Sequence, residues 1–313
     1  MTNADIIIKS NSVFTGLSEQ PESLAIAIKG NRILEVGKKE DILVFQGDKT
    51  EVIDVGDQLV MAGFHDAHLH IMLGSLFSHY CVSLTDVQSA DEAVAKVKVY
   101  SEEQNNQEWI IGTGWDHTAW GDKEFPTCYL LDAVLPDRPA VLLHAEGHYG
   151  WVNSKALEMA GITRNTENPA YGIIYKDDNG EPTGILIETA ISLVTDFAYD
   201  FPKETFSRMV AQFLDKAAQL GITSVNDLYA SRAHEKLEAY AIYKEFDEAG
   251  LLTTRFHVYP PLNGDIETAK KLREQYNSGK LKLAGLKQFI DGVVTGHTAF
   301  MLDPFSGGSG LFC

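Results

Sequence analysis

The stretch LVMAGFHDAHLH, residues 59–70, determines how the rest of this chain is interpreted. It begins as an apolar strand, contains one glycine and ends in the pair His68 and His70. Because side chains alternate faces along a strand, these two histidines point the same way, and two imidazoles on one face can hold a single metal ion. A His-x-His tripeptide alone is a weak motif. Its position at the end of an apolar strand, with Asp66 two residues earlier, makes this pair a candidate metal site.

Composition narrows the class of protein. The chain has 313 residues, of which 44% are hydrophobic, so it is long enough to bury a sizeable core. Its net charge of −18 argues against nucleic acid or an anionic membrane as a partner. The three cysteines are widely spaced and the N-terminus has no signal-peptide pattern, which favours a reducing cytoplasm. No apolar run approaches the roughly 18 residues of a membrane span, so no membrane span is expected.

The first sixty residues are expected to form a small β subdomain. Short β-branched runs occur at 5–9, 23–29, 32–37 and 51–55. Gly30-Asn31 lies between the second and third runs and is typical of a two-residue hairpin turn. We interpret residues 1–60 as a β-sandwich subdomain with a structural role.

Residues 201–313 alternate between helix and strand. Apolar spacing predicts helices over 206–217, 233–249 and 266–276, and strands over 222–228, 252–259 and 283–290. Repeated βα units indicate a parallel sheet. Together with the histidine strand at 61–73, these are expected to form four strands of an α/β barrel of the TIM type. Active sites of such barrels lie at the carboxyl ends of the strands, where His68, His70 and Lys287 fall.

Residues 74–200 are too long for one βα step and are interpreted as a large insertion that caps the barrel mouth. Strands are expected at 109–117 and 139–148, each running into a polar, aromatic turn. A helix is expected at 154–160, with Asn153 as its N-cap. Asn179-Gly180 predicts a further hairpin-type turn.

The chain resembles the amidohydrolase superfamily, specifically the amidohydrolase-3 branch that includes N-substituted formamide deformylase-like proteins. Ala62 differs from the proline that members commonly carry before the glycine. The resemblance covers nearly the whole chain and rests on GFHDAHLH at 63–70, GTGWDH at 112–117, LDAVLPDRPAVLLHAEGHYGWVNSKALEMAGI at 131–162, GEPTGILIE at 180–188, GITSVND at 221–227, and LKQFIDG at 286–292.

This resemblance implies a metal-dependent hydrolase that acts on a non-peptide, amide-type C–N bond in a small-molecule substrate. His68 and His70 correspond to the two metal ligands of the first barrel strand. Lys287 corresponds to the lysine of the fourth strand, which in many members adds CO2 and binds metal as a carbamate. The expected cofactor is one or two divalent ions, with zinc the default for histidine ligands, and the expected nucleophile is a metal-activated water.

Other candidate residues come from the insertion and the last loop. We consider His148 and Glu188 as catalytic groups, because burial of Glu188 in the apolar run 184–188 would suit it to proton transfer. Trp115, Asp116 and His297 are considered as lining of the substrate pocket. Each histidine or tryptophan could instead be a packed residue of the core with no role in the site. Glu188 could instead face solvent.

We count four of the eight strands of a TIM-type barrel in this sequence. In the superfamily, the further metal ligands come from strands five, six and eight. An open half-barrel exposes two edges, so we expect either a missing C-terminal half or a homo-oligomer. The sequence therefore leaves two functions open: a metal-dependent hydrolase, or a truncated, non-catalytic binding or regulatory remnant of one. Deamination or phosphoester hydrolysis on the same scaffold is a further alternative, because fold does not fix function.

Overall fold

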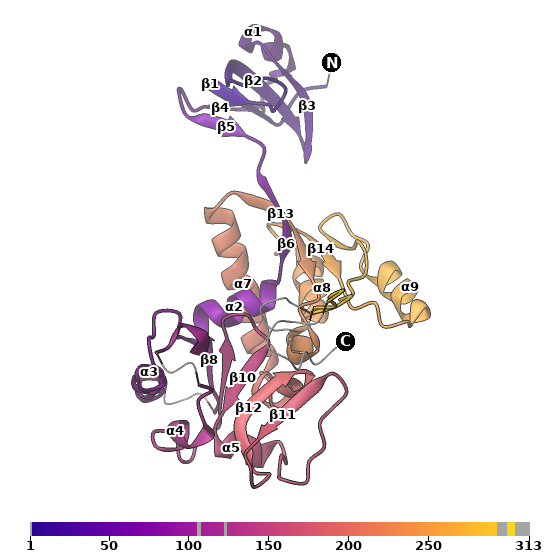
Figure 1. Cartoon of the computed structure of the whole chain (residues 1–313). Helices are drawn as coiled ribbons and strands as arrows, with labels where there is room; N and C mark the ends of the chain where they lie inside the picture. The colour runs from indigo at the N-terminus through magenta and orange to yellow at the C-terminus, as the bar shows by residue number, and fades with distance from the viewer. Residues whose placement is uncertain (1, 105–107, 122–123, 293–298, 304–313) are drawn as a thin grey trace. The chain divides into compact units, whose positions relative to one another are not determined.

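The structure is a computed structural model that describes residues 2–104, 108–121, 124–292 and 299–303 (Figure 1). The chain divides into two compact units, Met1–Phe64 and His65–Cys313. None of the helices in the described ranges is both long and apolar enough to cross a bilayer. All of the candidate site residues belong to the second unit, so the first is described only briefly.

The first unit is one five-stranded sheet with a short helix beside it. The hairpin expected at Gly30 is present: Lys29 pairs with Arg32, and Gly30 has a φ of 56°, which glycine adopts without steric cost. Ile7, Ala27 and Ile42 are buried in its small core. Its described residues form no second sheet that would make a sandwich. Its elements are β1 (Ile6–Phe14), β2 (Glu22–Lys29), β3 (Arg32–Gly37), α1 (Lys39–Ile42), η1 (Leu43–Phe45), β4 (Glu51–Asp54) and β5 (Leu59–Met61).

The second unit contains a mixed six-stranded sheet built from the expected insertion, in the order β11-β12-β10-β9-β8-β7. The strands β7, β8 and β9 run parallel, whereas β9, β10, β12 and β11 pair antiparallel. Asn153 caps α5 as expected, accepting a hydrogen bond from the Ala156 amide at 3.0 Å. The elements are β7 (Val82–Ser83), α3 (Ala90–Glu103), β8 (Ile110–Trp115), η2 (His117–Ala119), α4 (Cys128–Asp132), β9 (Ala140–His144), β10 (Tyr149–Val152), α5 (Ser154–Met159), β11 (Gly172–Lys176), β12 (Pro182–Glu188), η3 (Thr189–Ile191) and α6 (Ser192–Ala198).

A four-stranded sheet follows, in the order β15-β14-β13-β6. Its β13–β14 and β14–β15 pairs are parallel, which agrees with the expected βα repeats. In the described part of the chain this sheet is open, and no closed barrel is formed. The elements are β6 (Phe64–Leu69), α2 (Ile71–His79), α7 (Lys203–Gln219), β13 (Ile222–Leu228), η4 (Arg232–Leu237), α8 (Tyr240–Glu248), β14 (Arg255–Tyr259), α9 (Ile266–Gln275) and β15 (Leu281–Leu283).

The helix expected over 233–249 is divided into η4 and α8, with Glu238 in an extended conformation between them. Leu237 and Ala239 are both buried. Residues two apart lie on nearly opposite faces of a continuous helix, so burying both in one core requires this break. The expected strand at 283–290 is also displaced, because the regular strand is β15, Leu281–Leu283.

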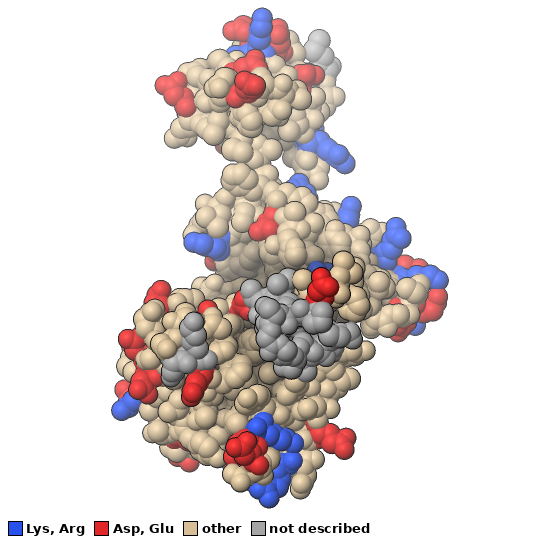
Figure 2. Space-filling model, in the orientation of Figure 1, with Lys and Arg blue, Asp and Glu red and all other residues tan. Residues whose placement is uncertain are grey.

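One hydrophobic core joins the two sheets of the second unit. It includes Ile71 of α2, Val141 of β9, Leu186 of β12, Met209 of α7 and Val225 of β13. On the face shown in Figure 2, Lys and Arg of the described residues lie in separate groups with Asp or Glu near several of them, and form no continuous basic surface.

Candidate functional site

His68 and His70 lie where β6 ends and α2 begins. Their ring centroids are 5.4 Å apart and the rings are nearly perpendicular. The Nδ1 of His70 lies 2.6 Å from the carbonyl oxygen of Leu228, at the end of β13. A carbonyl only accepts, so Nδ1 carries the proton and donates it. The lone pair of His70 is therefore on Nε2, which is the arrangement typical of metal-binding histidines.

The electrostatics around His70 favour a neutral ring. Burial lowers the pKa of His70, and the positive charges of His68 and Lys287 lower it further, against the effect of the Leu228 carbonyl. A metal ligand must be deprotonated at the binding nitrogen. His70 therefore meets this requirement at neutral pH, while His68 is exposed beside it.

Lys287 lies beyond the last described strand, not within it. Its backbone N–H donates to Pro260 at 2.8 Å, and it forms an isolated bridge with Pro261. Its Nζ is 4.6 Å from the ring centroid of Phe289, a cation–π contact. The positive charge of Lys287 contributes to the lowered pKa of His70. Its carbamylation stays a prediction.

Three buried polar residues that the sequence analysis did not single out line a pocket with His70: Asp227, His234 and Tyr243. Asp227 accepts hydrogen bonds from the Ile71 amide at 2.8 Å and the Tyr243 hydroxyl at 2.9 Å, and burial raises its pKa to about 6. Burial lowers the pKa of His234 to about 4. Asp227 could have been identified from the sequence, because it lies near the end of the expected strand 222–228. No local pattern distinguished His234 from a histidine on the surface of a helix.

The structure brings His148 and Glu188 together, although 40 residues separate them. The His148 Nδ1 and the Glu188 Oε1 are 2.8 Å apart, and both side chains are mostly buried. This hydrogen bond raises the pKa of His148, against the effect of burial. Glu188 has a φ of 52°, a conformation that costs a non-glycine residue energy and often occurs at functional sites. A proton-transfer role for the pair stays a prediction.

The three residues expected to line the substrate pocket differ in their positions. Trp115 is fully buried, and its Nε1 donates to the Leu142 carbonyl at 2.8 Å, so it is a core residue that presents no surface to a pocket. His297 lies outside the described residues. Asp116 lies at the end of β8, where it joins a cluster that the sequence analysis did not identify.

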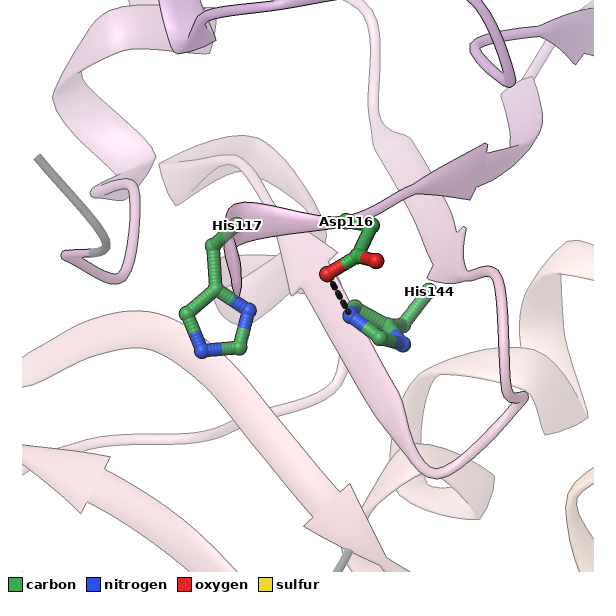
Figure 3. A group of neighbouring side chains, drawn as sticks. All are labelled: Asp116, His117 and His144. Carbon is green, nitrogen blue, oxygen red and sulfur yellow. Dashed lines mark ion pairs between the residues drawn. The ribbon is translucent and has the colours of Figure 1, made fainter. Parts of the chain in front are cut away.

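This cluster consists of Asp116, His117 and His144 (Figure 3). One ligand atom from each lies within 4.8 Å of the other two, and among the described residues no other three His, Cys, Asp or Glu side chains meet so closely. The His144 Nε2 and the Asp116 Oδ1 are 3.4 Å apart, close enough for an ion pair but without hydrogen-bond geometry. Burial lowers the pKa of both histidines, so both rings are neutral at neutral pH.

Known proteins resemble this chain over nearly its whole length. Protein LONG AFTER FAR-RED 3 of Arabidopsis thaliana is 29% identical over 309 residues, which is 96% of this chain and 53% of that protein. N-substituted formamide deformylase of Arthrobacter pascens is 29% identical over 252 residues, covering 79% of this chain and 45% of that enzyme. The chain therefore spans about half the length of these curated relatives.

A solved structure supports the fold. The crystal structure of an uncharacterized metal-dependent hydrolase from Pyrococcus horikoshii OT3 superposes with a TM-score of 0.68, covering 93% of this chain and 56% of that one at 20% identity. The family model described as "Amidohydrolase family" matches residues 51–312. This match includes the histidine strand, the six-stranded sheet and the open parallel sheet, and the chain belongs to the amidohydrolase family.

Proposed function

We propose that this chain carries active-site residues of a metal-dependent hydrolase that cleaves an amide-type C–N bond in a small molecule. The observation that supports this most directly is the His70 side chain. Its Nδ1 proton is engaged by the Leu228 carbonyl at 2.6 Å, which leaves Nε2 free to bind a metal. Membership of the amidohydrolase family supports hydrolysis as the class of reaction.

In this proposal His68 and His70 hold one divalent ion, and Lys287, as a carbamate, supplies an anionic oxygen ligand beside them. Zinc is the proposed metal, because imidazole and oxygen ligands suit it. The bound ion supplies Lewis-acid activation of a water and of the scissile carbonyl. The chain's own contribution is to fix the His70 ring and to keep it neutral.

The hydrogen-bonded pair His148 and Glu188 is proposed to move a proton between water and the leaving amine. A carboxylate that accepts from an imidazole keeps the ring oriented and stabilises its charged form. The Glu188 hydrogen bond raises the pKa of His148, so that more of the ring is protonated at neutral pH, which suits a proton donor.

The substrate class is proposed from a relative. The Arthrobacter pascens relative is named for deformylation of N-substituted formamides, which are small neutral amides. The open edges of the four-stranded sheet are proposed to be covered by a C-terminal continuation or by a second copy, which would complete a barrel of the TIM type. In that arrangement the insertion at 74–200 would cap the barrel mouth.

A non-catalytic binding or regulatory protein is the second candidate. The observation that favours it is the sheet β15-β14-β13-β6, which is open in the described part of the chain. In that case His68 and His70 would bind a metal ion or a small ligand without turning it over.

Metal binding and turnover measured on one preparation distinguish the two. The purified chain is loaded with Zn²⁺ in bicarbonate buffer, and we measure bound metal and formate release from a simple N-alkylformamide. We expect metal-dependent hydrolysis that His70→Ala abolishes and His79→Ala, at an exposed histidine in α2, preserves. Lys287→Met should lose the metal, whereas Lys287→Glu, which supplies a carboxylate, should retain more of it. Hydrolysis that His70→Ala leaves unchanged would overturn the proposed site, and bound metal without turnover would support the binding protein.

A further inference from the structure

Asp116, His117 and His144 form a cluster in a different sheet from His68 and His70. Asp116 follows β8 and caps η2, His117 is the first residue of η2, and His144 ends β9. Parallel pairing of β8 with β9 places Trp115 opposite His144, so the three residues meet at the carboxyl ends of two neighbouring strands. Figure 3 shows the three side chains directed toward one another from these two segments.

Two ring nitrogens in this cluster are buried without a hydrogen-bond partner among the described residues: Nδ1 of His117 and Nε2 of His144. The two rings are 9% and 3% exposed, so water does not compensate for the missing bonds. A buried polar atom without a partner destabilises the fold. A metal ion bound by both nitrogens would give each of them a partner.

The surroundings fix the two rings. His117 stacks on Phe125 with ring centroids 4.2 Å apart, and Trp115 meets His144 edge to face at 4.9 Å. The Asp116 side chain is 38% exposed and also accepts hydrogen bonds from Thr118, which holds the carboxylate in place. The site therefore combines two rigid neutral imidazoles with one carboxylate that water and ions can reach.

We propose that Asp116, His117 and His144 bind a divalent transition-metal ion of the zinc class, separately from the His68 and His70 site. Two imidazole nitrogens and one carboxylate oxygen are a donor set that zinc, cobalt and nickel accept. Three protein ligands leave a fourth position for water or for an oxygen ligand. The inference does not depend on the proposed hydrolase function.

Binding requires one change in the cluster. The Glu146 amide donates to the Nδ1 of His144 at 3.2 Å, which places the His144 proton on Nε2. Metal binding at Nε2 moves this proton to Nδ1 and releases the Glu146 amide. Glu146 is exposed, so its amide can bond to water instead.

The test uses the full chain carrying His68→Ala and His70→Ala, so that the other site does not contribute. Titration with Zn²⁺ by calorimetry should show one bound equivalent. Titration with Co²⁺ should quench tryptophan fluorescence, because Trp115 contacts His144 and an ion with a partly filled d shell quenches a nearby indole. The chain with only these two substitutions is the reference for every further variant.

Three further variants decide the outcome. His144→Gln should abolish binding, and Asp116→Asn, which keeps the side-chain shape at a partly exposed position, should weaken it by at least about tenfold. His79→Gln, at an exposed histidine in α2, should change nothing. If His144→Gln fails to fold, Asp116→Asn alone decides. No bound equivalent in the reference chain, or equal affinity in Asp116→Asn, would overturn the proposal.

Discussion

Replacing Asn153 with alanine tests how the segment that carries His144 and His148 is held. Asn153 is fully buried between β10 and α5. Its Oδ1 accepts from the amides of Ala140 at 2.9 Å and Ala156 at 3.0 Å. Its Nδ2 donates to the carbonyls of Leu135 at 3.0 Å and Arg138 at 2.8 Å. One side chain thus joins the start of β9, the cap of α5 and the loop before β9.

The magnitude follows from these four bonds. At a net contribution of about 1 kcal/mol each, their loss costs about 4 kcal/mol. The N-cap on α5 alone accounts for about 0.5–2 kcal/mol of this. Unpaired buried groups raise the cost, while a water molecule that enters the vacated space lowers it. We therefore expect Asn153→Ala to lower the free energy of unfolding by about 3–5 kcal/mol.

Urea unfolding followed by tryptophan fluorescence measures this loss, because the buried Trp151 lies two residues away. Asn165→Ala is the matched control: Asn165 is exposed, and we expect a change within about 0.5 kcal/mol. A loss below about 1 kcal/mol for Asn153→Ala would refute the reasoning, since it would mean that the four bonds contribute little.

Three further outcomes are expected. Since the Glu188 hydrogen bond raises the pKa of His148 above 6.5, the pair stabilises the fold fully below pH 6.5, and this contribution is lost as pH rises through the raised pKa. Glu188→Gln should return the His148 pKa toward 6.5 in an NMR titration, and an unchanged pKa would contradict the assigned cause. Gly184→Ala should cost more than about 2 kcal/mol in chemical denaturation, because φ is 99° and the new Cβ would lie 2.6 Å from the Val152 carbonyl oxygen. Gly180→Ala, with φ of 83° and open space, should cost only about 1 kcal/mol, and equal losses at both glycines would show that the steric contact is unimportant.

Local features of the sequence were predictable because a few neighbouring residues determine them. The hairpin at Gly30 follows from a conformation that glycine adopts without cost, and it is present. The Asn153 cap follows from a side chain that accepts from an amide three residues later. Helical spacing over 206–217 predicted α7, which spans Lys203–Gln219.

Positions within longer elements were less predictable. Burial of both Leu237 and Ala239 divides a helix that the apolar pattern indicated as continuous. Trp115 looked like a pocket residue because it ends a strand beside Asp116, yet it is fully buried. In each case the outcome depends on which side of the helix or strand faces the core. Contacts with neighbouring elements determine that side.

The sequence by itself determined that a strand leads into His68 and His70 and that helices and strands alternate in the later part of the chain, because local apolar patterns set both. Only the tertiary structure decided which distant groups meet these histidines. The Leu228 carbonyl engages His70 across 158 residues of sequence, and strand pairing brings His144 to Asp116. Such contacts depend on sheet order and register, and these are set by packing between segments that no local pattern connects.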